Sequence, residues 1–329
     1  MIACAQSLEL KGARRMVELE EEVSRDLGYA GAVATPTGSH AIGLALRAQF
    51  PSGALVGCPS YICRSVYDAI VMAGCEPCLL DIDPVTFSVS PERTQACGVD
   101  AVVVAHMFGI RAPIEDFLES GLFVVEDCAQ RIAPPEVARR EPKSPVRMLS
   151  FEATKILAAG EGGLLLADDK VLLERVRRLR DAPYDLAQAA PGFRPTEMQA
   201  AVALTQWRRL GAFLRRRREI ATFYLDRLDA VPGMRACDTY HFRFLVPARE
   251  PSPFIRRAAE YGVVARRPVA PACLHQVFGV SGSFPVSEDA FAGVVSLPIY
   301  PALTDEEAER VAAAALEAQR SSGAANCQE

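Results

Sequence analysis

Apolar runs and helix-like periods alternate along the first half of the chain. This alternation predicts an α/β domain with a mostly parallel sheet. The predicted strands are the apolar runs at residues 30–34, 54–58, 78–82, 101–106, 122–126, 146–151 and 163–167. The predicted helices lie at 12–28, 39–50, 61–73, 113–120 and 170–180. Several strands are apolar throughout, which is typical of a sheet that helices cover on both faces.

The second half of the chain has a different pattern. A long helical period runs over 196–228, with a break expected near Gly211, and leads to a smaller α+β unit. The elements predicted there are a strand at 242–247, a helix at 254–261, a strand at 263–267, and a last helix that begins at Thr304 with Glu307 in a capping box. We therefore predict a large domain over 1–205 and a small C-terminal domain over 206–329 that begins with the bridging helix.

Composition narrows the classes of partner. The chain has 329 residues, a net charge of -5 and 50% hydrophobic residues. No apolar run reaches the about 18 residues that indicate a membrane span, and the net acidity gives no support for nucleic-acid binding. The basic run at 215–218 lies inside the long helical period, where a solvated helix face is the usual explanation. We expect neither a membrane nor a nucleic acid as partner.

The cysteines indicate a reducing compartment. The chain has 10 cysteines and no N-terminal export signal, so we predict the cytoplasm. Cys75 and Cys78 form C-E-P-C, but no second pair or histidine cluster accompanies them. A metal or redox site is therefore disfavoured at this pair, and we predict no metal ligands.

The segment T-P-T-G-S-H at 35–40 ends one predicted strand and opens a helix. Backbone N–H groups without internal partners converge at such a start and can bind an anion, and Gly38 would let an oxyanion approach closely. The segment is neither a G-x-G-x-x-G fingerprint nor a P-loop. A phosphate site and a capped helix both explain it.

Two further polar residues follow predicted strands. Asp127 comes after the run at 122–126, so it should emerge at the carboxyl end of a buried strand, where α/β sheets bind ligands. It can hold a cationic ring nitrogen or cap the next helix. Lys155 follows the run at 146–151. A lysine shielded from water can lose its proton and form a Schiff base, although an exposed loop lysine is the usual case.

The three features together indicate pyridoxal phosphate (PLP). Its phosphate binds helix N-termini, its pyridinium nitrogen pairs with a carboxylate, and its aldehyde reacts with an amine. A turn of the required kind follows the first predicted strand, and an aspartate and then a lysine follow the strands at 122–126 and 146–151.

A series of motifs extends this pattern from about residue 12 to residue 319. They are G-S-H-A-I, P-S-Y, A-G-C-E-P-C-L-L-D-I-D-P, H-M-F-G, V-V-E-D-C-A-Q, S-F-E-A-T-K with G-E-G-G, F-R-P-T-E-M-Q-A-A, and S-L-P-I-Y-P-A-L-T-D-E-E. In this order they resemble the DegT/StrS-like nucleotide-sugar aminotransferases. The resemblance implies PLP fold-type I, an aspartate-aminotransferase-like large domain with a smaller α+β domain.

The resemblance also implies roles for individual residues. Lys155 would bind the cofactor aldehyde and shuttle the proton, and Asp127 would pair with the ring nitrogen. The other implied cofactor-binding positions are Gly38, Ser39 and the His40 amide at the phosphate, Ser150 beside them, Gln130 and His106 near the ring, and Cys63. His106 could equally pack at a strand end.

Substrate and subunit contacts are implied as well. The family's site lies between two subunits, so a homodimer is expected, with Phe193 and Arg194 facing the partner's cofactor. Arg266 could meet a donor carboxylate or be an ordinary surface arginine.

The sequence departs from the family pattern at several places. Cys63 stands where an aromatic residue usually stacks on the cofactor, and Gly192 stands where an asparagine usually reaches the neighbouring phosphate. The chain also begins later than the family's usual N-terminal segment, which helps form the acceptor wall. These departures leave Lys155 and Asp127 unaffected.

The predicted function is a PLP-dependent aminotransferase of specialised metabolism. It would move an amino group from glutamate or glutamine to a keto sugar, cyclitol or similar polar ketone. A PLP-dependent lyase or condensing enzyme on the same scaffold is the first alternative, because PLP supplies the electron sink in each case. A non-catalytic regulatory descendant is the second.

Overall fold

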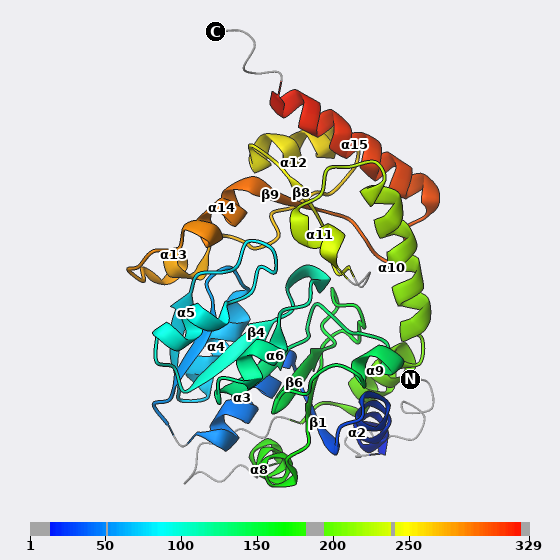
Figure 1. Cartoon of the computed structure of the whole chain (residues 1–329). Helices are drawn as coiled ribbons and strands as arrows, with labels where there is room; N and C mark the ends of the chain where they lie inside the picture. Colours follow the sequence, from blue (N-terminus) through cyan, green and yellow to red (C-terminus); the bar gives the residue numbers. More distant parts are fainter. Residues whose placement is uncertain (1–13, 51, 182–193, 238–240, 324–329) are drawn as a thin grey trace.

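The computed structural model describes residues 14–50, 52–181, 194–237 and 241–323, with a seven-stranded sheet at the centre (Figure 1). The strand order is β1-β7-β6-β5-β4-β2-β3. The strands are β1 (Gly31–Thr35), β2 (Leu55–Pro59), β3 (Glu76–Leu80), β4 (Ala101–Ala105), β5 (Phe123–Asp127), β6 (Val146–Ser150) and β7 (Gly163–Ala167). Every neighbouring pair is parallel except those of β7 with β1 and β6. The predicted α/β class with a mostly parallel sheet is confirmed.

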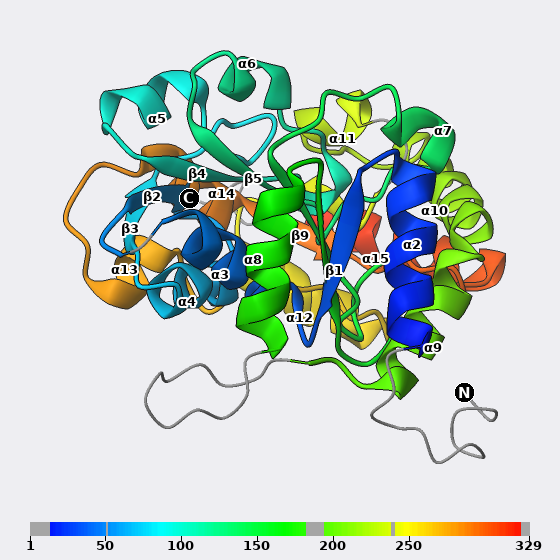
Figure 2. The same ribbon diagram turned by 90° about the horizontal axis from the view of Figure 1, so that it is seen from below.

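Helices cover both faces of this sheet (Figure 2). They are α2 (Arg14–Leu27), α3 (Gly38–Gln49), α4 (Arg64–Met72), α5 (Pro91–Ala96), α6 (Ile114–Leu118), α7 (Pro135–Ala138), α8 (Lys170–Asp181) and α9 (Glu197–Trp207), with a short 3-10 turn η1 (Met107–Gly109). Val103 of β4 packs in the core beneath α3 and α4, whereas Val102 and Val104 pack against α6. Both faces of β4 are therefore dry, which explains why its sequence is apolar throughout.

The remaining elements form a second layered unit above the sheet (Figure 1). They are α10 (Leu210–Leu225), α11 (Pro232–Ala236), β8 (Phe244–Pro247), α12 (Pro251–Glu260), α13 (Leu274–Phe278), α14 (Pro285–Gly293), β9 (Val294–Leu297) and α15 (Asp305–Gly323). β8 and β9 pair antiparallel, and α10, α12 and α15 share one core with them. Residues 269–294 return to the core of the large sheet through Val269, Leu274 and Phe284. The boundary predicted at residue 205 falls inside α9.

Several predicted elements differ in detail from the structure. The long helical period is two helices, interrupted at Arg208 and Arg209, two residues before Gly211. The strand predicted at 263–267 is reduced to an isolated bridge between Arg266 and Ser296. Helices α13 and α14 and strand β9 have no counterpart among the predicted elements, because their short periods carry little hydrophobic pattern.

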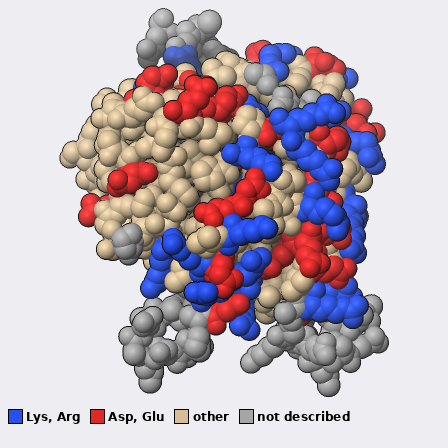
Figure 3. All heavy atoms as spheres, turned by 60° about the horizontal axis from the view of Figure 1, so that its bottom comes forward, with Lys and Arg blue, Asp and Glu red and all other residues tan. Residues whose placement is uncertain are grey.

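Charge is mixed on the face shown in Figure 3, where basic and acidic side chains interleave rather than forming one basic patch. Among the described residues, no helix has the length and apolar character needed to cross a membrane.

Candidate active site

The carboxyl ends of β5 and β6 bring the predicted polar residues to one edge of the sheet. Asp127 ends β5 and Ser150 ends β6, and the two strands are parallel neighbours with Asp127 opposite Met148. Lys155 lies in the turn that follows β6, where its amide donates to the Glu152 carbonyl at 2.9 Å. The side chains that the sequence places after separate strands therefore share one edge, as the parallel order requires.

The start of α3 forms a backbone cradle beside Ser150. Thr37 caps the helix and accepts the His40 amide at 3.2 Å. In the described part of the chain, the amides of Gly38 and Ser39 donate to no protein acceptor. A Cβ on Gly38 would lie 3.0 Å from the Ser150 Cβ and 3.3 Å from its Oγ. The two amides and the Ser150 hydroxyl therefore suit a phosphate, whereas the His40 amide serves the cap.

Gly38→Ala tests this cradle. The added methyl would also come 2.8 Å from the Met148 sulfur, so the helix start or the Ser150 side chain must shift. We expect a loss of about 1–3 kcal/mol in the free energy of unfolding and cofactor binding weaker by roughly tenfold, measured by denaturant titration and by spectroscopic titration with PLP. The control is Gly211→Ala, whose methyl meets nothing closer than 3.7 Å; it should be neutral or stabilise by about 0.5–1 kcal/mol. Equal behaviour of the two variants would contradict the cradle.

Asp127 is a buried carboxylate with spare hydrogen-bonding capacity. Its side chain belongs to a residue only 6% exposed, and Oδ1 accepts the Ala129 amide at 2.8 Å. Among the described residues, nothing donates to Oδ2. Burial raises the pKa of Asp127, while the Ala129 amide and the positive charge of Lys155 oppose the rise. A cation placed against Oδ2 would therefore be bound strongly.

Gln130 is fixed by the loop that follows β4. Its Oε1 accepts the Phe108 amide at 2.8 Å, and the Phe108 carbonyl accepts the Phe242 amide at 3.0 Å. Phe108 holds a positive φ of 62°, a conformation that a bulky residue rarely adopts. One loop thus links the Gln130 side chain to the chain segment that leads into β8.

Lys155 lines a cavity of about 700 Å³ between the sheet edge and the second unit. Lys155 is half-buried, and its Nζ lies 5.3 Å from the centroid of the Phe242 ring. Arg243, Arg266, Ser296 and other residues of the second unit form the opposite wall. The predicted Arg266 thus shares the cavity of the predicted Lys155.

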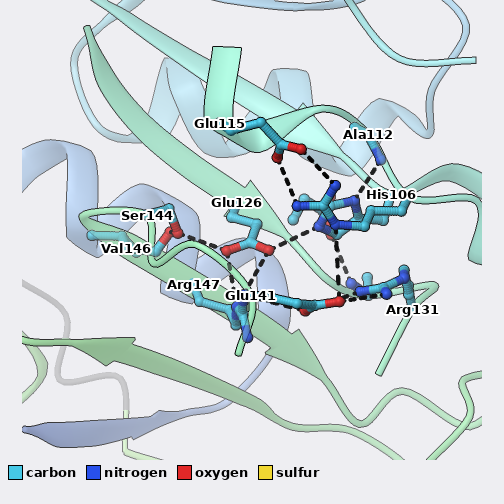
Figure 4. Close-up of polar contacts among 12 residues, drawn as sticks. His106, Ala112, Glu115, Glu126, Arg131, Glu141, Ser144, Val146 and Arg147 are labelled. Atoms are coloured by element: carbon cyan, nitrogen blue, oxygen red, sulfur yellow. Dashed lines mark hydrogen bonds and ion pairs between the residues drawn. The ribbon is translucent and has the colours of Figure 1, made fainter. Parts of the chain in front are cut away.

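His106 lies in a buried ionic network rather than in the cavity lining (Figure 4). Its Nδ1 accepts the Ala112 amide at 3.0 Å, so Nε2 carries the proton and donates to Glu126 at 2.8 Å. Glu126 also accepts two bonds from Arg147, at 2.8 and 3.0 Å, and one from Ser144 at 2.7 Å. Burial lowers the pKa of His106, which is neutral. The ring therefore positions Glu126, the residue before Asp127.

His106, Glu126 and Cys128 bring potential metal ligands within 4.8 Å of one another. Glu126 is already neutralised by Arg147, and the Nδ1 of His106 is taken by a backbone amide. Burial raises the pKa of the Cys128 thiol well above its ordinary value, so it stays protonated. The cluster is explained as part of the ionic network.

The other predicted positions lie away from these contacts or outside the described residues. Cys63 is exposed at the N-cap of α4, with its Sγ 3.0 Å from the Ser65 hydroxyl. Arg194 pairs with Asp181, Nε to Oδ1, at 2.8 Å. Phe193 and Gly192 lie outside the described residues.

Sequence reasoning missed two arginines in the cavity wall. Arg217 belongs to the basic run interpreted as a solvated face, but it is 4% exposed and donates to the carbonyls of His241, Phe242 and Ile299 at 3.2, 3.2 and 2.8 Å. A signal was present, because Arg217 falls on the same helical stripe as Leu214 and Tyr224. Arg243 carries no comparable signal, since one arginine between two phenylalanines does not indicate what it faces.

His241, whose carbonyl accepts a hydrogen bond from Arg217, should make the free energy of unfolding depend on pH. Burial and the Arg217 charge lower the pKa of His241 to about 4, against about 6.5 for an unfolded histidine. The unfolded chain binds the proton first, so stability is full above pH 6.5 and falls as the pH drops toward 4. Between pH 7.5 and 5, protonation of His241 in the unfolded chain should lower the free energy of unfolding by about 2 kcal/mol. Urea titrations of wild type and His241→Gln at several pH values would check this. If the free energy of unfolding of the two proteins fell equally between pH 7.5 and 5, the prediction would be wrong.

Comparisons with known proteins agree with this geometry. A profile of the DegT/DnrJ/EryC1/StrS aminotransferase family matches residues 2–316. The dTDP-4-dehydro-2,3,6-trideoxy-D-glucose 4-aminotransferase of Saccharopolyspora spinosa is 28% identical over 292 residues, with 77% of this chain and 75% of that protein covered. The X-ray structure of S. venezuelae DesV matches with a TM-score of 0.86 and 26% identity, covering 97% of this chain and 94% of that one.

A more distant structure shows the same fold with a cofactor. NtdA of Bacillus subtilis, solved with bound PMP, matches with a TM-score of 0.79 and 19% identity, covering 93% of this chain and 77% of that one. The family resemblance predicted from the motifs is confirmed. The chain belongs to the DegT/DnrJ/EryC1/StrS aminotransferase family and is a PLP-dependent transferase of fold-type I.

Proposed function

We propose that the protein transfers an amino group from glutamate or glutamine to the keto carbon of a sugar, cyclitol or similar polar ketone in specialised metabolism. The observation that carries the proposal is Lys155: it lines a cavity of about 700 Å³, and its positive charge acts on the carboxylate of Asp127 at the end of β5, although neither Asp127 nor Ser150 lines that cavity. Cavities of about 300–1,000 Å³ accommodate small molecules. The named sugar aminotransferase of S. spinosa supports the choice of a keto sugar.

The residues present fit PLP. The amides of Gly38 and Ser39 and the Ser150 hydroxyl suit its phosphate, because a side chain at Gly38 would fill the cradle. The unshared Oδ2 of the buried Asp127 suits its ring nitrogen. When bound, PLP supplies an electron sink for the carbon that loses its proton.

Side chains of the protein have separate roles in the proposed reaction. The Lys155 Nζ takes the proton from the carbon of the amino donor in the first half-reaction and gives a proton to the carbon of the acceptor in the second. Asp127 keeps a positive charge on the ring nitrogen, and Gln130, held by Phe108, orients the ring. The buried Phe242 ring beside Nζ limits access of water.

We also propose a cytoplasmic homodimer. Helix α4 exposes Val71 and Met72, each 51% exposed, and α13 exposes Val277 at 39%. Tyr67 and Phe278 stack at 3.8 Å between centroids and join the two helices. Apolar exposure on neighbouring elements is typical of a subunit contact. Sedimentation equilibrium should give twice the mass of the 35.6 kDa chain; a monomer would contradict this part.

The proposed reaction is tested by its separate half-reactions. PLP-loaded protein mixed with L-glutamate should change its visible spectrum and release 2-oxoglutarate, and L-glutamine should release 2-oxoglutaramate. The aminated protein should then return to its first spectrum with a keto sugar or cyclitol ketone. Lys155→Ala is the blank. A PLP-loaded wild type whose spectrum stays constant with both donors would overturn the proposal.

A further inference from the structure

Two phenylalanines have a backbone conformation that their side chains disfavour. Phe87 has a φ of 57° and Phe108 a φ of 62°, and in the described part of the chain they are the only residues other than glycine with a positive φ. A bulky residue keeps this left-handed conformation only where the surrounding contacts impose it, and such strain is concentrated at functional sites. Phe87 lies in the loop after β3 and Phe108 in the turn after β4, both beyond the carboxyl ends of their strands.

The two strained residues contact each other. Their rings lie edge to face, with centroids 5.4 Å apart and planes at 80°. The ring of Tyr61, in the loop after β2, has its centroid 6.2 Å from that of Phe87 and 6.3 Å from that of Phe108. All three residues are at most 3% exposed. This aromatic trio of Tyr61, Phe87 and Phe108 joins the loops that follow the neighbouring strands β4, β2 and β3, and its ring contacts offset the backbone strain.

The strained backbone of Phe108 serves two parts of the site. Its N–H donates to the Gln130 Oε1 at 2.8 Å. Its carbonyl accepts the amides of Phe242 at 3.0 Å and Arg243 at 3.5 Å. The Phe242 ring is the one that lies 5.3 Å from the Lys155 Nζ. One residue therefore holds both the side chain that we propose to orient the cofactor ring and the segment beside the reactive lysine.

The Phe108 N–H also fixes which way the Gln130 amide is turned. A backbone N–H can only donate, so the side-chain oxygen of Gln130 must face it. The Nε2 of Gln130 is then left with the Met107 sulfur, a weak acceptor 3.9 Å away, and it has no stronger acceptor among the described residues. Gln130 is thus presented to a ligand as a hydrogen-bond donor whose orientation depends on the backbone of Phe108.

We propose that Phe108 is a positioning residue of the cofactor site, held in its strained conformation by Phe87 and Tyr61; this rests on the proposed role of Gln130. The strain keeps the Phe108 N–H on Gln130 and its carbonyl on Phe242, so that both are ordered before the cofactor binds. The ring of Phe108 acts through its backbone and touches neither Lys155 nor Asp127 in the listed ring and polar contacts of the described residues.

The first measurement compares cofactor affinity with stability. Wild type and variants are freed of cofactor, titrated with PLP by visible absorption, and unfolded in urea. Phe108→Leu loses the edge-to-face contacts while keeping the strain, so its backbone should relax and PLP binding should weaken by roughly tenfold. Phe108→Gly adopts the same φ without strain, so it should bind PLP more tightly than Phe108→Leu, although its larger cavity should lower the urea midpoint further.

Phe117→Leu is the matched control. Phe117 is 0% exposed beneath the same sheet but lies in helix α6, with no strained backbone. The change should lower the urea midpoint and leave PLP binding unchanged. If Phe108→Gly fails to fold, the comparison of Phe108→Leu with Phe117→Leu still decides the question.

The second measurement needs no cofactor. Hydrogen–deuterium exchange of the cofactor-free proteins follows the peptide that contains Phe242, whose amide bonds to the Phe108 carbonyl. Its exchange should be faster in Phe108→Leu than in wild type and unchanged in Phe117→Leu.

Three results would overturn the positioning role. They are equal PLP affinity in Phe108→Leu and wild type, equal weakening in Phe117→Leu, and PLP affinities that simply follow the urea midpoints. Failure of the proposed function gives a different result: PLP binding and exchange would depend on Phe108 as predicted, while the wild type formed neither 2-oxoglutarate nor 2-oxoglutaramate from its donors.

Discussion

Replacing Lys155 by alanine should reduce transamination by about a thousandfold or more, because one amine both binds the cofactor and carries the proton. Nζ lies at the cavity surface near Phe242, and the other described lysines, Lys143 and Lys170, do not line this cavity. Release of 2-oxoglutarate from L-glutamate measures the loss. The visible band of the bound cofactor should change at the same time.

Two comparisons make this result specific. Lys170→Ala changes an exposed lysine at the start of α8 and should leave activity unchanged. Added methylamine should restore part of the activity of Lys155→Ala, since a free amine can move the proton. A Lys155→Ala enzyme that keeps a tenth of its activity or more would contradict the assigned role.

Glu126→Gln should cause the largest loss of stability. Glu126 is 1% exposed and binds Arg147 through two hydrogen bonds while accepting from His106 and Ser144 (Figure 4). Burial opposes ionisation, yet the charge of Arg147 holds the pKa of Glu126 far below its ordinary value. Removing the charge leaves Arg147 buried with Glu141, 3.7 Å away, as its remaining carboxylate. We expect a loss of about 3 kcal/mol in the free energy of unfolding.

Equilibrium denaturation in urea measures this loss. The matched control is Glu306→Gln, since Glu306 is 88% exposed and lies 4.0 Å from Arg310; it should change stability by less than about 0.5 kcal/mol. Because β5 carries Glu126 and then Asp127, cofactor binding in Glu126→Gln should weaken as well. A Glu126→Gln protein as stable as wild type would show that the network is dispensable.

The part of the site that could be predicted lies at strand ends. The predicted strand at 122–126 has four apolar residues before Glu126, and the run at 163–167 has no polar side chain, so the residue that follows such a strand could be placed at the edge of a sheet. That reasoning placed Asp127 and Lys155 at the edge that the structure shows. The start of α3 could be predicted from a different signal, because T-P-T-G-S-H combines an N-cap residue with a glycine.

The rest of the site depends on contacts between distant segments. Arg217 is buried because the 241–242 segment before β8 and the 298–300 segment bring their carbonyls to α10, and a run of four arginines gives no hint of this. Arg243 and Arg266 meet only through Ser296 of β9, a strand of four residues whose pairing is not local. His106 could be placed at the end of a strand, but its partners Glu126 and Ala112 are set by the packing of β4 against β5.

The most direct test of the central claim is the chemical identity of the cofactor link. The PLP-loaded protein is reduced with borohydride, digested, and its peptides are measured by mass spectrometry. The account predicts a phosphopyridoxyl adduct on the peptide that contains Lys155. An adduct confined to Lys143 or Lys170, or no adduct on any peptide, would contradict it.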